Sequence, residues 1–238
     1  MKAMLLAAGL GTRLKPWTDK HPKALAVVNG KSLLQRNIEY LASYGIRDIV
    51  INVHHFSGQI IEAIEKNNGW GANISISDES DEVLETGGGL RKAQPLLEKE
   101  ANFLLMNADI LTNLDLHAFI QHHTQQNNLA TLAVSDRISS RYFLFDENEK
   151  LCGWKNINTG EAKITRITKT ATAKAFSGMH LISSRIFPLM QRTGKFSMVD
   201  VYLDLSKQIN IGCYDHTGAA FLDVGKPESI EQAAKLFR

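Results

Sequence analysis

The first half of the chain alternates between short apolar segments and amphipathic segments, and this alternation constrains the fold more than any other feature. Continuous apolar segments are typical of strands that are covered on both faces, and apolar residues at helical spacing are typical of helices packed against a sheet. The expected strands are Met4–Ala8, Ile49–Val53, Ile74–Ser77, Phe103–Met106 and Leu129–Val134, and the expected helices are Ser32–Tyr44, Gly58–Asn67, Gly88–Leu97 and Leu116–Gln126. Such alternation predicts parallel βαβ units with right-handed crossovers. We therefore expect an α/β fold with a mostly parallel sheet flanked by helices.

The pattern changes after Ser135, where short strands and polar turns replace the alternation. Strands are expected at Tyr142–Phe145, Leu151–Trp154, Lys163–Ile167, Phe176–Ile182 and Ile211–Tyr214, and helices at Val199–Gln208 and Glu228–Phe237. No linker or repeat separates the two halves, and 238 residues suffice for one large domain. The prediction is a single domain, residues 1–238, with one lobe at about 1–135 and a smaller lobe at 136–238.

Composition excludes several classes of partner and location. The net charge of +2 argues against nucleic-acid binding and against a polybasic membrane anchor. Cys152 and Cys213 are far apart and are expected to be buried apolar residues in a reducing cytoplasm. The apolar N-terminal segment contains Gly9 and leads into Arg13 and Lys15, which favours a strand over a secretory signal. No other stretch approaches the ~20 apolar residues of a membrane helix.

The segment after the first strand is rich in glycine, proline and cations. Gly9 and Gly11 resemble the start of a dinucleotide fingerprint, but Leu14 stands where the third glycine is needed. Pro16 and Pro22 also prevent a long regular helix here, and the P-loop pattern is absent. These features disfavour an NAD-dependent oxidoreductase.

The same segment is suited to binding a triphosphate. Glycines at Gly9 and Gly11 let backbone N–H groups approach phosphates closely. The guanidinium of Arg13 can bind phosphate oxygens bidentately, and Lys23 can act as a point charge on another phosphoryl group. A long loop with cations at both ends can surround a whole triphosphate.

Five segments, taken together and in order, resemble the signature of the sugar-1-phosphate nucleotidyltransferases. They are Leu6–Thr18 with Pro22-Lys23, Glu85–Gly89, Asn107–Asp109, Phe176–Gly178 and Phe221–Pro227. These enzymes join a nucleoside triphosphate to a sugar 1-phosphate and release pyrophosphate. The resemblance covers nearly the whole chain and implies a Rossmann-like nucleotidyltransferase fold with a sugar-binding lobe. The short length and the Glu-Thr-Gly-Gly-Gly turn are most similar to uridylyltransferases for N-acetylmuramate 1-phosphate, with mannose- and heptose-phosphate guanylyltransferases close behind.

The resemblance implies roles for individual residues. Catalytic roles fall to Arg13 and Lys23. Nucleotide-binding roles fall to Ala7, Ala8, Gly9, Gly11, Thr12, Arg13, Lys23, Glu85, Thr86, Gly87, Gly88 and Asn107. Sugar-phosphate binding falls to Asn107, Ser177 and Gly178, and to Lys174 only as the nearest lysine, because the Glu-Lys-Pro segment of larger relatives is absent. Ala108 replaces the usual glycine and is expected to crowd the backbone beside Asp109.

Two aspartates each follow an apolar segment. Asp109 comes after Phe103–Met106, and Asp223 comes after Ala219–Leu222. A carboxylate at such a place is commonly a cap or turn residue, but Mg²⁺ prefers one or two carboxylates together with phosphate oxygens and water. We expect Asp109 and Asp223 to share one Mg²⁺ between the α-phosphate and the sugar phosphate.

Other polar residues receive ordinary interpretations. The pairs His54-His55 and His122-His123 lack zinc-ligand spacing and are expected at the surface or partly buried. The acidic segment Asp78–Glu82 is expected to be a solvated loop. Trp17 either closes over substrate or packs, and Thr86 either caps a helix or contributes to a turn beside the base.

Three alternatives stay open at this point. A guanylyltransferase or a cytidylyltransferase for a phospho-alcohol would use the same cations, because these recognise phosphates. A non-catalytic nucleotide-sugar sensor on the same fold is disfavoured by the complete set Arg13, Lys23, Asp109 and Asp223. The expected partners are a nucleoside triphosphate and a sugar 1-phosphate, with no nucleic acid and no membrane, in a monomer or homodimer.

Overall fold

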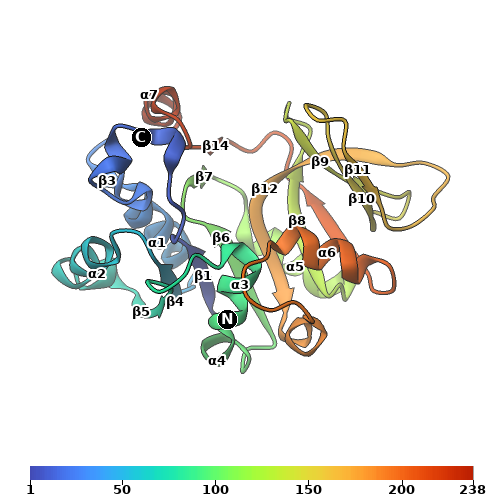
Figure 1. Cartoon of the computed structure of the whole chain (residues 1–238), viewed down its shortest axis with the longest axis horizontal. Coiled ribbons are helices and arrows are strands. Elements are labelled where there is room, and N and C mark those ends of the chain that lie inside the picture. Colours follow the sequence, from blue (N-terminus) through green and yellow to red (C-terminus); the bar gives the residue numbers. More distant parts are fainter. Residues whose placement is uncertain (238) are drawn as a thin grey trace.

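A computed structural model describes residues 1–237, and a ten-stranded sheet runs through them (Figure 1). The strands lie in the order β11-β10-β9-β12-β6-β1-β4-β5, and β8 pairs with both β12 and β13. Their bounds are β1 (Ala3–Leu6), β4 (Asp48–Val53), β5 (Asn73–Asp78), β6 (Asn102–Asn107), β8 (Ala130–Ser135), β9 (Arg141–Phe145), β10 (Leu151–Asn156), β11 (Ala162–Ile164), β12 (Thr172–Ser183) and β13 (Ile211–Asp215). Two short pairs lie outside this sheet: β2 (Val27–Val28) with β3 (Lys31–Ser32), and β7 (Ile110–Thr112) with β14 (Phe221–Asp223).

The helices follow the amphipathic segments of the sequence. The α-helices are α1 (Leu33–Ser43), α2 (Ser57–Lys66), α3 (Glu85–Lys92), α4 (Gln94–Leu97), α5 (Leu116–Gln126), α6 (Met198–Ser206) and α7 (Pro227–Leu236). Short 3-10 turns are η1 (Thr12–Leu14), η2 (Trp17–Asp19), η3 (Lys23–Leu25), η4 (Asn68–Gly71) and η5 (Ser184–Leu189). Asp115 caps α5 by accepting from the backbone N–H groups of His117 and Ala118. Within residues 1–237, no helix is long and apolar enough to cross a membrane.

The predicted α/β fold with a mostly parallel central sheet is confirmed. Strands β5, β4, β1 and β6 pair in parallel, as do β8 and β13, and β12 runs antiparallel to β6, β8 and β9. Strand β1 lies in the middle, where Leu5 pairs with Ile51 on one side and Met106 on the other. The apolar segment near the N-terminus is thus a central strand. The sheet continues past residue 135, and the division into two lobes there stays a prediction.

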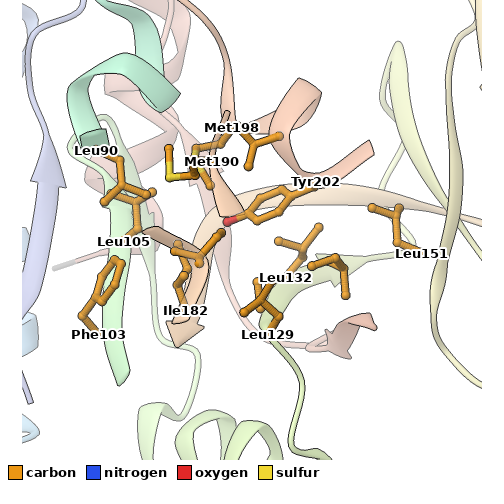
Figure 2. Close-up of a cluster of buried hydrophobic side chains, with 14 of the residues drawn as sticks. Leu90, Phe103, Leu105, Leu129, Leu132, Leu151, Ile182, Met190, Met198 and Tyr202 are labelled. Atoms are coloured by element: carbon orange, nitrogen blue, oxygen red, sulfur yellow. The ribbon is translucent and has the colours of Figure 1, made fainter. Parts of the chain in front are cut away.

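Both faces of the central strands are buried, as the continuous apolar segments predict. Along β6, Phe103 and Leu105 pack into one cluster, whereas Leu104 and Met106 pack into the cluster on the opposite face. The first cluster contains residues of α3 and α6, and Figure 2 shows Tyr202 of α6 among its aliphatic side chains. The second contains residues of α1, α2 and α5. Helices thus cover both faces of the sheet, and the carboxyl ends of the parallel strands β5, β4, β1 and β6 lie together at one edge of it.

Several segments differ from the sequence-based expectation. Strand β12 is longer than Phe176–Ile182 and pairs with β6, β8 and β9, and its register against β8 shifts between Phe176 and His180. The helix expected at Gly88–Leu97 is two helices that meet at Ala93, in agreement with Pro95 near the start of α4. Strands β7 and β14 were not expected, since each has only three residues. Their pairing brings distant parts of the chain to one place.

Candidate active site

Arg13, Lys23, Asp109 and Asp223 meet at one end of the sheet, and we call them the charged cluster. Lys23 Nζ donates to Oδ2 of Asp109 and lies 3.9 Å from Oδ1 of Asp223. Arg13 Nη2 lies 3.8 Å from Oδ2 of Asp223. The Lys23 side chain is only 10% exposed, whereas that of Arg13 is 62% exposed. One buried ammonium therefore lies between two carboxylates, and an exposed guanidinium lies outside.

The pairing of β7 with β14 explains how the two aspartates meet. Asp223, the last residue of β14, pairs with Ile110, the first residue of β7. The next residue, Val224, donates its N–H to the carbonyl of Asp109 at 2.8 Å. Asp109 itself directly precedes β7 and follows the end of β6. The backbone ladder thus fixes both carboxylates beside each other.

Gly11 allows Lys23 to reach this place. Gly11 has a φ of +62°, and a Cβ there would lie 2.9 Å from both Lys23 Cβ and Thr18 Cγ2. Thr18 Oγ1 also donates to the Gly11 carbonyl at 3.0 Å, which ties the loop together. By contrast, a Cβ on Gly9 would meet nothing within 4 Å. Of the two glycines, only Gly11 is required by the fold of the loop.

The electrostatics of the charged cluster favour a cation between the two carboxylates. Partial loss of water and the nearby negative charge of Asp109 raise the pKa of Asp223, whereas Lys23 and Arg13 act in the opposite direction. Since two neighbouring carboxylates repel each other, a shared cation stabilises their charged forms. Lys23 has this position in the structure, and a divalent ion with phosphate ligands fits the same pair of carboxylates.

A cavity of about 260 Å³ opens beside the charged cluster, and we call it the nucleotide pocket after the ligand that the sequence leads us to expect there. It is lined by Leu6, Ala8, Gly9, Asn52, Glu79, Val83, Glu85, Thr86, Asn107 and Asp109. Leu6, Asn52 and Asn107 are the paired residues at the ends of β1, β4 and β6. Open α/β sheets bind ligands at this carboxyl edge.

Asn52 and Glu79 hold the start of the loop that follows β1 and contains Gly9 and Gly11, which we call the glycine loop. Asn52 Oδ1 accepts hydrogen bonds from the N–H groups of Ala7 at 2.7 Å and Ala8 at 3.3 Å. Asn52 Nδ2 donates to Glu79 Oε1 at 2.7 Å. The amides of Ala7 and Ala8 are thus already paired, so any part that these two residues take in nucleotide binding uses other atoms.

Glu79 corrects the expectation of a solvated acidic loop over Asp78–Glu82. It is fully buried because its N–H continues the sheet by donating to the Val53 carbonyl at 2.8 Å. Its Oε2 atom has no hydrogen-bond partner among residues 1–237. Burial raises the pKa of the Glu79 carboxyl, against the effect of the hydrogen bond from Asn52. A polar Asn at the end of an apolar strand was the one signal in the sequence that pointed to this network.

The turn expected at Thr86–Gly89 is instead part of the first two turns of α3, which begins at Glu85. Thr86 does not cap this helix, and its Oγ1 accepts from the N–H of Met198 at 2.9 Å. Gly87 and Gly88 both donate to the Phe196 carbonyl. A Cβ on Gly87 would lie 2.5 Å from the Phe196 ring, so the glycines let α3 approach this segment closely. Glu85 and Thr86 line the nucleotide pocket, but Gly87 and Gly88 do not.

On the other side of the charged cluster, β12 approaches Asn107. Gly178 has a φ of +71°, and a Cβ there would lie 2.8 Å from Asn107 Nδ2. The Ser177 side chain is buried, and its Oγ is 2.7 Å from Nε2 of His216. These contacts bring Ser177 and Gly178 toward the nucleotide pocket but leave the Ser177 hydroxyl already paired.

Lys174 is held away from the charged cluster by other carboxylates. Its Nζ lies 2.6 Å from Asp136 Oδ1 and 2.6 Å from Asp215 Oδ2. Partial burial opposes its charge, but these two hydrogen bonds outweigh burial and raise the pKa of Lys174. Its charge is already balanced, which weakens the sugar-phosphate role expected for it.

The structure also places Ala108, the histidines and the two cysteines. Ala108 does not crowd the site, because its methyl group is buried in the core and its carbonyl accepts from Asn37 Nδ2 at 2.9 Å. His123 is buried, contrary to the expectation, with Nδ1 2.8 Å from Thr131 Oγ1. In the part of the chain that the structure describes, no group of three or more His, Cys, Asp or Glu residues could hold a metal ion. Cys152 and Cys213 are free and buried, as expected.

The geometry defines a class of protein. A glycine loop, a pocket at the carboxyl edge of a parallel sheet and a cluster of cations with paired carboxylates are suited to an enzyme that transfers a nucleotidyl group. The chain belongs to the nucleotidyl transferase family, whose sequence profile matches residues 2–150. Within that family it is a sugar-1-phosphate nucleotidyltransferase. Enzymes of this kind use a nucleoside triphosphate, a sugar 1-phosphate and a divalent metal ion.

Known proteins agree with this assignment over the whole chain. An N-acetylmuramate alpha-1-phosphate uridylyltransferase of Neisseria meningitidis is 30% identical over 99% of this chain and 98% of its own length. A mannose-1-phosphate guanyltransferase of Yarrowia lipolytica is 25% identical over 100% of this chain but only 64% of its own length. Among solved structures, HddC from Yersinia pseudotuberculosis complexed with GMP-PN superposes with a TM-score of 0.78 at 25% identity, covering 100% of this chain and 99% of HddC.

Proposed function

We propose that this enzyme transfers a uridylyl group from UTP to N-acetylmuramate 1-phosphate with the help of Mg²⁺. The observation that carries the proposal is the position of Lys23, between the carboxylates of Asp109 and Asp223 and beside a pocket for a nucleotide. The choice of substrates rests on the uridylyltransferase of Neisseria meningitidis, because that match extends over nearly the full length of both chains.

In the proposed reaction, an oxygen of the sugar phosphate attacks the α-phosphorus of UTP in line. The new P–O bond forms as the bond to the β-phosphate oxygen breaks, and pyrophosphate leaves with the electron pair. Arg13 and Lys23 bind the triphosphate, with Lys23 nearer the α-phosphate. No covalent nucleophile is required, because orientation and electrostatic stabilisation supply most of the rate acceleration.

Asp109 and Asp223 are the residues that would hold Mg²⁺. They fit the ion because hard carboxylate oxygens are its preferred protein ligands, and because one cation already lies within 4 Å of both. When bound, Mg²⁺ would neutralise charge on the reacting phosphates. The flexible stem of Lys23 then lets its ammonium turn from the two carboxylates toward a phosphate.

The other site residues follow the geometry of the pocket. Gly9, Gly11 and Thr12 surround the phosphates, Ala8 lines the pocket behind them, and Ala7 directly precedes it. Glu85, Thr86 and Asn107 contact the nucleoside, while Gly87 and Gly88 set the position of α3. Asn107, Ser177 and Gly178 lie on the sugar side. The free Oε2 of Glu79 can accept a hydrogen bond from the N3–H of uracil, and equally from the N1–H of guanine.

A guanylyltransferase for a mannose or heptose phosphate is the second candidate. It is favoured by the GMP-PN complex of HddC, which aligns with all of this chain. A cytidylyltransferase for a phospho-alcohol is supported by likeness of fold alone, and a non-catalytic nucleotide-sugar sensor is disfavoured by the complete charged cluster. We further propose that the reaction occurs in the cytoplasm, since two buried free cysteines suit a reducing compartment.

A pyrophosphate-release screen tests the proposal. The enzyme is incubated with UTP, GTP, CTP, ATP or dTTP and a panel of sugar 1-phosphates, with and without Mg²⁺. We expect release with UTP, N-acetylmuramate 1-phosphate and Mg²⁺ together, and little with any one of them missing. Lys23→Ala should abolish most turnover, whereas the matched change Lys20→Ala, at an exposed lysine of the same loop, should not. Release with GTP and mannose 1-phosphate alone would select the second candidate, and nucleotide-sugar binding without turnover would select a sensor.

A further inference from the structure

Arg137 lies outside every motif that the sequence brought forward. It follows the end of β8, next to β12 (Figure 1), and its side chain is half-buried. Its Nη2 donates to the carbonyl of Phe176 at 2.6 Å, and its Cζ lies 4.9 Å from the centroid of the Phe221 ring. The guanidinium therefore lies between Phe176 of β12 and Phe221 of β14.

The hydrogen bonding of this guanidinium is incomplete. Its Nε is buried and has no partner, and within residues 1–237 no carboxylate lies within 4 Å of Arg137. The cations Arg13, Lys23 and Lys174 each have such a carboxylate. Burial lowers the pKa of Arg137, and the negative charge of Asp223 acts in the opposite direction. A partly buried cation without a carboxylate partner opposes folding, and an anionic ligand at the guanidinium would offset that cost.

His216, which lies near the Phe221 ring, also has a ring nitrogen without a hydrogen-bond partner. His216 is buried, its Nε2 is 2.7 Å from Ser177 Oγ, and its Nδ1 has no partner in the described part of the chain. Its ring centroid is 6.0 Å from that of Phe221. Arg137 and His216 thus each carry a nitrogen that could form a further hydrogen bond, and both lie near Phe221. Phe221 is two residues before Asp223 in the sequence. None of Arg137, His216 and Phe221 lines the nucleotide pocket.

We propose that Arg137 binds an oxyanion of the sugar substrate. A guanidinium matches both a phosphate and a carboxylate bidentately, so the anion is either the 1-phosphate or a carboxylate carried by the sugar. The triphosphate already has Arg13 and Lys23, and Lys174 is neutralised by two aspartates. Arg137 therefore acts as a substrate-binding residue for the acceptor. This inference rests on the proposed transfer to a sugar 1-phosphate and assigns the residue that recognises that substrate.

The test compares Arg137→Gln and Arg137→Lys with Arg141→Gln, a matched control at an exposed arginine four residues further on. The substrates are N-acetylmuramate 1-phosphate and N-acetylglucosamine 1-phosphate, which differ by one carboxylate-bearing lactyl group. We expect Arg137→Gln to raise the KM for the sugar by about 10- to 100-fold, with partial recovery in Arg137→Lys. The KM for the nucleotide and the Tm should change little. If the KM rises for N-acetylmuramate 1-phosphate alone, the anion bound by Arg137 is the carboxylate. If the KM rises equally for both sugars, the anion is the 1-phosphate.

Unchanged KM values for both sugars in Arg137→Gln would overturn the inference. So would a fall in Tm with equal increases in the KM of sugar and nucleotide, because that is the signature of a structural role. Calorimetric titration of each sugar 1-phosphate into the wild-type enzyme separates this test from the proposed function, since it needs no turnover. If wild type binds a sugar phosphate without turnover, the proposed function fails. Arg137 is then judged by whether Arg137→Gln weakens that binding, and absence of binding to wild type overturns both.

Discussion

Asn52 and Glu79 form a buried hydrogen bond of 2.7 Å directly beneath the glycine loop. The other end of the Asn52 amide accepts from the N–H groups of Ala7 and Ala8. One side chain therefore connects a buried carboxyl group to the backbone that forms the wall of the nucleotide pocket. The position of this loop therefore depends on a residue from a different strand, β4.

Replacing Asn52 by Ala should destabilise the protein and weaken nucleotide binding. The change leaves two backbone donors and one buried carboxyl oxygen without partners, at a cost of about 1–3 kcal/mol for each unsatisfied group. We expect a total loss of at least about 3 kcal/mol in the free energy of unfolding, measured by urea denaturation, and a higher KM for the nucleotide. Asn73→Ala is the matched control, because Asn73 makes an exposed hydrogen bond to Asp48. Equal stability of the two variants would contradict this role for Asn52.

Gly11 and Gly9 should respond differently to the same substitution. Gly11→Ala introduces a Cβ at positive φ, 2.9 Å from Lys23 Cβ, so we expect a loss of about 1–2 kcal/mol from the backbone alone and displacement of Lys23. Both Tm and kcat should fall. Gly9→Ala adds a methyl group to open space and should leave Tm unchanged, although it can affect the KM for the nucleotide. Thermal denaturation with steady-state kinetics measures both, and a Tm drop of similar size in Gly9→Ala would refute the distinction.

Asp109 and Asp223 should behave as one unit in catalysis. Asp109→Asn and Asp223→Asn each remove a charge while keeping the shape, and each should lower kcat/KM by about 10²- to 10³-fold. The double variant should lose far less than the product of the two single effects, because both carboxylates act through one ion. Rates measured across a Mg²⁺ titration check this, and strictly multiplicative losses would show that the two residues work independently. Asp204→Asn, at an exposed aspartate on α6, provides the control.

Two buried histidines should make the folded state sensitive to acid. Burial lowers the pKa of His123 to about 4 and that of His180 to about 3, against about 6.5 in the unfolded chain. Below pH 6.5 the unfolded state therefore binds more protons than the folded state. The stability that each neutral histidine contributes is complete above about pH 6.5 and is lost as pH falls toward the folded pKa, by about 1.4 kcal/mol per pH unit for each.

Urea denaturation at pH 7.5 and pH 5.0 measures this loss. We expect His123→Gln to reduce the difference between the two pH values by on the order of 1–2 kcal/mol. His117→Gln, at an exposed histidine on the same helix, should leave the difference unchanged. The same pH dependence in wild type and His123→Gln would count against His123 as one of the titrating groups.

The sequence by itself determined the central sheet, its helices and the chemistry of the loop. Apolar periodicity is local, so Phe103–Met106 predicted a strand covered on both faces, and the structure buries its side chains in two opposite clusters. Pro16 and Pro22 likewise excluded a long helix, and three short 3-10 turns are present instead. The segment Asn107–Asp109 was identified by its resemblance to the family motif and by its place after a buried strand, where open α/β sheets bind ligands.

Only the tertiary structure decided which polar groups meet. The pairing of β7 with β14 joins Asp109 to Asp223, and segments of three residues are too short to carry a period that the sequence could reveal. Glu79 was expected to be solvated because its neighbours are acidic. It is buried, since its N–H extends the pairing of β5 with β4 by donating to the Val53 carbonyl. Lys174 was expected at the sugar phosphate only as the nearest lysine, and in the structure Asp136 and Asp215, from the ends of two other strands, neutralise it. Such contacts depend on strand order and register, and those are set by packing between residues far apart in the chain.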